Sequence, residues 1–85
     1  PVLEYAAPGT PLVIEMIMDE EVFNIQLRKF LKKVGIQSQR EIEQAVRTGV
    51  DSGSLSGDEK LKASVLLRVP EAGVEITIED DIALR

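Results

Sequence analysis

Apolar residues recur every three or four positions from Phe23 to Val34, which is the spacing of one face of an α-helix. The residues with this spacing are Phe23, Leu27, Phe30, Leu31 and Val34. Asp19 precedes them as an N-cap, and cations gather at the far end, where the helix dipole favours positive charge. Gly35 is then suited to end the helix in the left-handed conformation. The pattern predicts a first helix over residues 19–34.

The following segment, VGIQSQREIE (residues 34–43), predicts a corner and a second helix. Ser38 and Glu41 have the S-x-x-E spacing of a capping box, in which both side chains bond backbone N–H groups. Apolar residues follow at inward-facing spacing: Ile42, Ala45 and Val46. We expect this helix to be short and to end in a glycine- and serine-rich loop from about residue 48 to residue 59, which makes a helical hairpin.

Beyond residue 59 the apolar positions alternate with polar ones, as in a half-buried β-strand. The two alternating sets are Leu61, Ala63, Val65, Leu67 and Val69, and then Val74, Ile76, Ile78, Ile82 and Leu84. The segment PEAG (residues 70–73) between them has the length of a hairpin turn. Outward cations on the first strand are expected to face outward carboxylates on the second. The predicted fold is therefore α+β: two short helices packed on a C-terminal antiparallel β-hairpin, one α-α-β-β domain over residues 18–85.

The first 17 residues differ in composition from this domain. Residues 1–11 contain three of the four prolines, so we expect them to be extended or irregular. The apolar run LVIEMIM (residues 12–18) fits either a strand or a backward extension of the first helix. From this composition we expect residues 1–17 to form a disordered extension of the domain.

Composition excludes several chemistries and favours association. The chain of 85 residues has no cysteine and no histidine, which excludes disulfides, Cys- or His-based metal sites and histidine catalysis. A domain of this size buries so little surface on folding that its free energy of unfolding is small. We therefore expect a homodimer, with another protein as a further possible partner. The only long apolar run is too short to span a bilayer, so we expect a cytoplasmic protein with no membrane partner.

The charge is unevenly distributed along the chain. Its net value is −5, yet residues 26–48 contain six cations and two anions and carry +4, which leaves −9 on the remainder. The residues best placed to contact an anionic partner are Lys29, Lys32, Lys33, Arg40 and Arg47. With a glycine turn and a hairpin wing, they suggest a winged-helix-like DNA-binding protein as the alternative to a protein-binding module. The apolar residues of the second helix are out of step with that motif, so nucleic acid is the less favoured partner.

Enzymatic function has little support in the sequence. The densest acidic cluster is Glu79, Asp80 and Asp81. Alternation in a strand turns Glu79 and Asp81 to one side and Asp80 to the other, unless Asp80 marks a bulge. A solvated, aggregation-resistant edge explains this cluster without catalysis. We expect no enzyme activity, no catalytic residue, no metal and no cofactor.

The string VFNIQLRKFLKKVGIQSQREIEQAV and the later LKASVLLRVPEAGVEITIEDDIAL resemble a family of short proteobacterial proteins known as a domain of unknown function. The shared motif is FNxxxRKFLKxVGxxSQREIExAV, and the resemblance covers about residues 18–84. Because members of this family begin near the position of Met18, the resemblance implies that residues 1–17 are an extension not native to the domain. It implies no activity, cofactor or site residue. Together with the composition it suggests a small soluble bacterial protein of unknown function that acts by binding.

Overall fold

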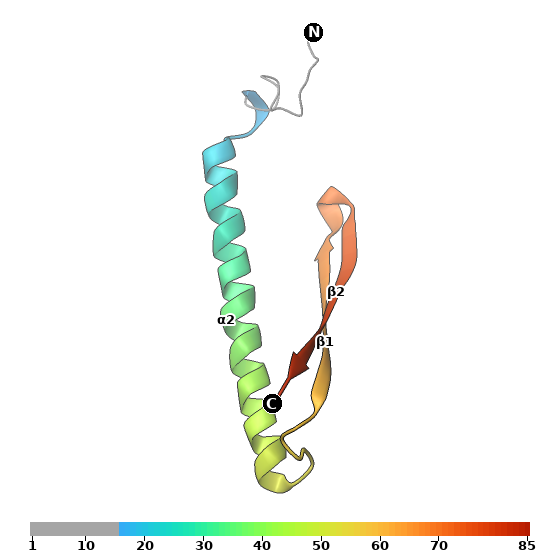
Figure 1. The fold of residues 1–85 in the computed structure, drawn as a ribbon. Helices are drawn as coiled ribbons and strands as arrows, with labels where there is room; N and C mark the ends of the chain where they lie inside the picture. Colours follow the sequence, from blue (N-terminus) through green and yellow to red (C-terminus); the bar gives the residue numbers. More distant parts are fainter. Residues whose placement is uncertain (1–15) are drawn as a thin grey trace. The chain divides into compact units, whose positions relative to one another are not determined.

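The computed structural model of the chain describes residues 16–85 (Figure 1). It contains a long helix, α2 (Glu20–Ser52), and a hairpin of two strands, β1 (Lys60–Val69) and β2 (Val74–Ala83), joined by the 3₁₀ turn η1 (Pro70–Ala72). The chain divides into two compact units, residues 1–41 and 42–85, with the boundary inside α2. Each unit is therefore described by itself.

The predicted start of the first helix is confirmed. Asp19 Oδ1 accepts hydrogen bonds from the backbone N–H groups of Glu21 (2.9 Å) and Val22 (3.2 Å). These N–H groups have no partner within the helix, so an N-cap carboxylate stabilises them. The acidic residues Glu20 and Glu21 occupy the first turn, where the helix dipole favours negative charge.

The prediction of two short helices is wrong, because α2 continues without a break through the segment expected to form the corner. Positive φ angles occur at Gly53, Gly57 and Gly73, whereas Gly35 is an ordinary helical residue. A glycine inside a helix costs only about 1 kcal/mol relative to alanine. The good helix formers on either side of Gly35 outweigh that cost, and the Ser38–Glu41 pair lies in the helix interior.

The true end of the helix is Ser52, so the loop predicted from residue 48 begins five residues later. Gly53 has a φ of 85°, and its N–H donates to the carbonyl of Val50 at 3.2 Å. A left-handed glycine directly after the last helical residue is a common helix ending. The N–H of Leu55 then donates to the carbonyl of Gly49 at 2.9 Å, which ties the loop back to the last turn of α2.

The β-hairpin is confirmed together with its turn and its pattern of faces. The strands pair antiparallel in register from Lys60–Ala83 to Val69–Val74, and Gly73 closes the turn with a φ of 69°. Arg68 Nε lies 3.6 Å from Glu75 Oε1, as expected for outward residues of opposite charge. The N–H of Leu84 donates to the carbonyl of Glu59 at 3.0 Å, which extends the pairing one step beyond the strands.

No apolar side chain of residues 16–85 is buried, and the buried residue among them is Gly49. An isolated two-stranded hairpin is marginally stable in water, and long helices owe most of their stability to packing. The packing of helices on the hairpin therefore stays a prediction. Residues 1–15 of the predicted extension lie outside the described residues, and its last two residues, Met16 and Ile17, are helical.

Candidate interaction surfaces

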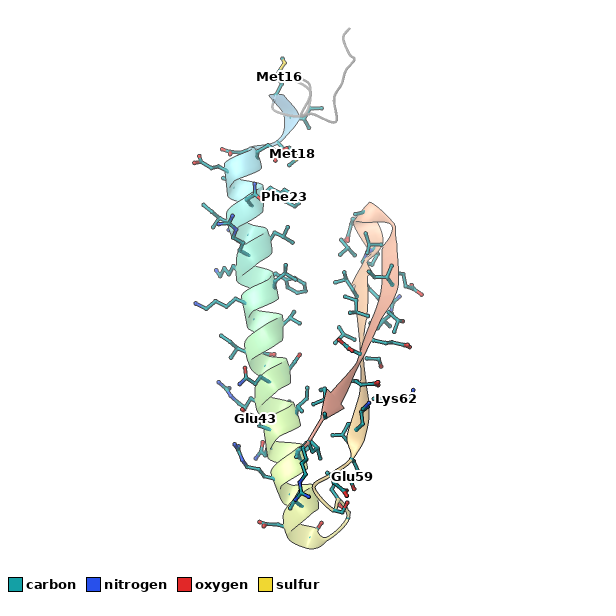
Figure 2. The ribbon with its side chains drawn as sticks, in the orientation of Figure 1. Met16, Met18, Phe23, Glu43, Glu59 and Lys62 are labelled. Carbon is teal, nitrogen blue, oxygen red and sulfur yellow. The ribbon has the colours of Figure 1, made fainter. Side chains whose placement is uncertain are left out.

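One side of α2 carries a continuous row of apolar side chains, called the apolar stripe below. It consists of Phe23, Leu27, Phe30, Leu31 and Val34. At 3.6 residues per turn these positions span roughly 100° of the helix circumference. Phe23 is 50% exposed and Phe30 49%, so about half of each side chain reaches solvent within the described part of the chain (Figure 2 labels Phe23). Exposed aromatic side chains grouped in this way are typical of protein-binding surfaces.

The five cations predicted to contact an anionic partner follow another side of α2, called the basic ridge. Lys29, Lys33 and Arg40 are spaced by four and seven residues, which places them within about 40° of one another around the helix, and Arg47 follows seven residues later in the second unit. Lys32 lies about 60° to one side of Lys29. The ridge and the apolar stripe are roughly 140° apart. Continuity of the helix thus aligns cations that a corner at Gly35 would have divided between two helices.

The basic ridge is exposed, and its part over residues 29–40 contains no acidic residue. All five of its residues are exposed, and no acidic residue occurs between Val22 and Arg40. Lys29 and Arg40 are about 17 Å apart along the helix axis, at 1.5 Å per residue. Further along α2, Arg47 Nη1 lies 4.0 Å from Glu43 Oε1, a weak exposed pair. The ridge can therefore hold an extended anionic group most strongly over residues 29–40.

The hairpin has one apolar side, called the hairpin face. Directly paired residues of an antiparallel ladder share a face, so this side consists of Leu61, Ala63, Val65, Leu67, Val69, Val74, Ile76, Ile78, Asp80 and Ile82. Ile76 is 51% exposed and Ile78 54%. The register also shows where Asp80 lies: it pairs with Ala63 on this apolar side, and the ladder has no bulge there.

The acidic cluster predicted to be a solvated edge lies beside a depression of about 330 Å³. The depression is lined by Lys62, Ala63, Ser64, Glu79, Asp80 and Asp81. Asp81 pairs with Lys62 across the strands and Glu79 with Ser64, so the two carboxylates share the polar side. Within residues 16–85 no group of three or more side chains is arranged to hold a metal ion.

Glu59 organises the loop before β1, a role that sequence reasoning missed. Its Oε2 accepts the N–H of Ser56 at 2.8 Å, and its Oε1 accepts the N–H of Gly57 at 3.0 Å. The bond from Ser56 is the main cause of a lowered pKa of Glu59, and it outweighs the opposing effect of desolvation. Ser56 and Glu59 have the same S-x-x-E spacing as Ser38 and Glu41, so a sequence signal for this contact was present.

The winged-helix-like arrangement suggested by the sequence is wrong, because its glycine turn and the segments on both sides of that turn form one helix. Within residues 16–85 no helix begins near Arg40, because Arg40 lies inside α2. Among residues 16–85, no helix is long and apolar enough to cross a membrane.

Comparison with known families confirms the resemblance noted in the sequence. A family of unknown function, DUF6494, matches residues 18–85. The comparison with curated proteins gives no match, and neither does the comparison with solved structures. The matched range includes all of α2 and the whole hairpin, and so each of the three surfaces described above. The chain therefore belongs to DUF6494, a family of unknown function.

Proposed function

We propose that this protein is a non-catalytic interaction module that acts by binding, and that it associates with a second copy of itself. One observation carries the proposal: no apolar side chain of residues 16–85 is buried, while the apolar stripe and the hairpin face both reach solvent. Burial of apolar surface is the main favourable term in folding and association. A second chain supplies the burial that a single copy lacks.

The chemistry of the chain is consistent with a binding role. It has no histidine, the most frequent general acid–base residue, and no cysteine, one of the common covalent nucleophiles. The proposal also places the protein in the bacterial cytoplasm. A chain without cysteine forms no disulfides, so its fold does not depend on an oxidising compartment.

The test is the molecular mass of the full chain in solution, measured by sedimentation over a range of concentrations. We expect a mass twice the 9.4 kDa of one chain. Phe30→Glu should weaken association at least about tenfold, because charge replaces an exposed aromatic side chain in the centre of the stripe. Leu66→Glu is the matched control, since Leu66 is 57% exposed but lies on the polar side of the hairpin opposite Thr77.

Two results would contradict this proposal. The first is a monomer for the unmodified chain up to high micromolar concentration. The second is equal weakening by Phe30→Glu and Leu66→Glu, because that would show that association does not depend on the apolar stripe. Circular dichroism of each variant checks that its helix is retained.

A second candidate function is binding of nucleic acid through its phosphates, and the alignment of the basic ridge along one helix favours it. Phosphate contacts give affinity that falls steeply with salt, and even non-specific binders associate at micromolar concentration. The net charge of −5 opposes this function, so it ranks second.

Anisotropy of labelled random duplex DNA at low salt tests this second function. The triple variant Lys29→Gln, Lys33→Gln, Arg40→Gln should reduce affinity at least about tenfold, because three phosphate contacts are lost. Its control removes the same charge from β1 through Lys60→Gln, Lys62→Gln and Arg68→Gln, and should bind as the unmodified chain does. Absence of binding at micromolar protein would exclude this function.

A further inference from the structure

Asp80 is the charged residue on the otherwise apolar hairpin face. It lies between Ile78 and Ile82 along its side of β2, directly opposite Ala63. Its Oδ1 accepts a hydrogen bond from the N–H of Asp81 at 2.7 Å. The outward carboxylate Glu75, by contrast, has Arg68 beside it at 3.6 Å.

Any chain that covers the hairpin face must accommodate this carboxylate. Removing an ionised carboxylate from water without a partner is strongly unfavourable, whereas a paired carboxylate is tolerated. The covering surface therefore needs two properties: apolar side chains for residues such as Ile76 and Ile78, and a cation near Asp80. A purely apolar partner surface does not meet this need.

The apolar stripe of α2 has cations on both of its edges. Arg28 lies about 60° around the helix from Leu31, and Lys33 about 60° from Phe30 on the opposite edge. Both side chains are long enough to place their charge at the rim while their stems cover apolar surface. The stretch from Val22 to Arg40 has five cations and no acidic residue, so the field around the stripe is positive.

We infer that the occupant of the hairpin face is α2 of a second copy of this chain, with the apolar stripe on the hairpin face and Asp80 paired with Arg28 or Lys33 at its edge. This inference rests on the proposed self-association and identifies its two surfaces. In a two-fold dimer each copy offers both surfaces, so the contact occurs twice.

The area of this double contact is sufficient for a stable dimer. A half-exposed aromatic side chain leaves roughly 75–125 Å² in water, and the smaller aliphatic side chains leave somewhat less, so that about 80 Å² is a mean for the set. In each proposed contact the five stripe residues, of which Val34 is only partly exposed, meet the four most exposed residues of the hairpin face (Val65, Val69, Ile76 and Ile78). Two contacts then bury apolar surface within the roughly 1,200–2,000 Å² that specific interfaces require.

Reversal of charge on each surface tests the pairing. Variant one is Asp80→Lys, and variant two is Arg28→Glu with Lys33→Glu. Each alone should self-associate at least tenfold more weakly than the unmodified chain, because like charges then meet in both contacts. In an equimolar mixture both contacts regain opposite charges, so the two variants should form a heterodimer of near-normal affinity. The control Glu79→Lys changes the neighbouring carboxylate on the polar side and should dimerise normally.

Sedimentation of one fluorescently labelled variant with its unlabelled partner distinguishes the outcomes, and Asp80→Asn provides a milder variant if Asp80→Lys does not fold. Variants that self-associate normally would overturn the pairing but leave the proposed function intact. The pairing would also be overturned if each variant alone self-associates more weakly but the equimolar mixture forms no heterodimer. A monomeric unmodified chain would instead refute the proposed function, and the inference with it.

Discussion

The backbone of Gly49 lies against the side chain of Leu55: a Cβ atom added at residue 49 would come within 2.7 Å of Leu55 Cδ1. Leu55 also donates its N–H to the carbonyl of Gly49 at 2.9 Å. The hydroxyls of Ser52 and Ser54 donate to the same carbonyl at 3.2 and 3.3 Å. This close approach joins the last turn of α2 to the loop that leads into β1, and it requires a residue without a side chain.

Gly49→Val should destabilise this junction. The added methyl groups displace Leu55, and overpacking of this kind costs about 1–3 kcal/mol. Urea unfolding followed by circular dichroism at fixed protein concentration gives the change in the free energy of unfolding. The double variant Gly49→Val, Leu55→Ala relieves the clash, so its cost should be smaller than the sum of the single costs. Simple additivity would show that the two residues do not interact.

Gly35→Ala should have the opposite effect and stabilise the protein. Nothing lies within 4 Å of a Cβ atom at residue 35, and the residue is inside α2. Alanine is favoured over glycine in a helix interior by about 0.8–1.0 kcal/mol. Thermal unfolding should show a higher midpoint for the variant. A loss of stability would indicate that Gly35 ends a helix after all, because alanine is strained in the left-handed conformation.

Gly53→Ala tests the observed helix end in the same way. Gly53 has a φ of 85°, which is unfavourable for a residue with a Cβ atom by roughly 1–2 kcal/mol. We expect a lower midpoint of thermal unfolding, in contrast to the effect of alanine at residue 35. If Gly53→Ala raises the midpoint as alanine at residue 35 is expected to do, the assignment of the helix end to Ser52 is wrong.

The hairpin was predictable from sequence because its determinants are local. Alternation of apolar residues fixes the faces, and Pro70 and Gly73 fix the turn. The continuity of α2 through Gly35 was not predictable in this way, because a glycine and an S-x-x-E pattern indicate only that a helix can end there. Whether it ends depends on the helix-forming residues on both sides, whose effect is summed over many positions.

The surfaces were predictable only in part for the same reason. The basic residues were identified from charge alone, but their alignment follows from the continuity of α2. The side of the hairpin on which Asp80 lies depends on whether β2 contains a bulge. The register of the two strands shows that it does not, whereas the sequence of β2 alone allows either case. The S-x-x-E pattern occurs twice, and the pair in the loop, Ser56 and Glu59, is the one that forms the carboxylate-to-backbone bond.

Glu59 should make stability depend on pH below neutrality. The N–H groups of Ser56 and Gly57 hold its pKa below the ordinary value of 4.5 in the folded state. The unfolded chain therefore binds the proton more readily, and stability rises with pH across the interval between the two pKa values. This contribution is complete above pH 4.5 and is lost as the pH falls through the lowered pKa. An NMR titration of the Glu59 side chain should give a midpoint below 4.5, and a midpoint at or above 4.5 would contradict the loop geometry. Glu59→Gln should flatten this part of the stability–pH curve, because the amide has no ionised form for the two N–H groups to stabilise.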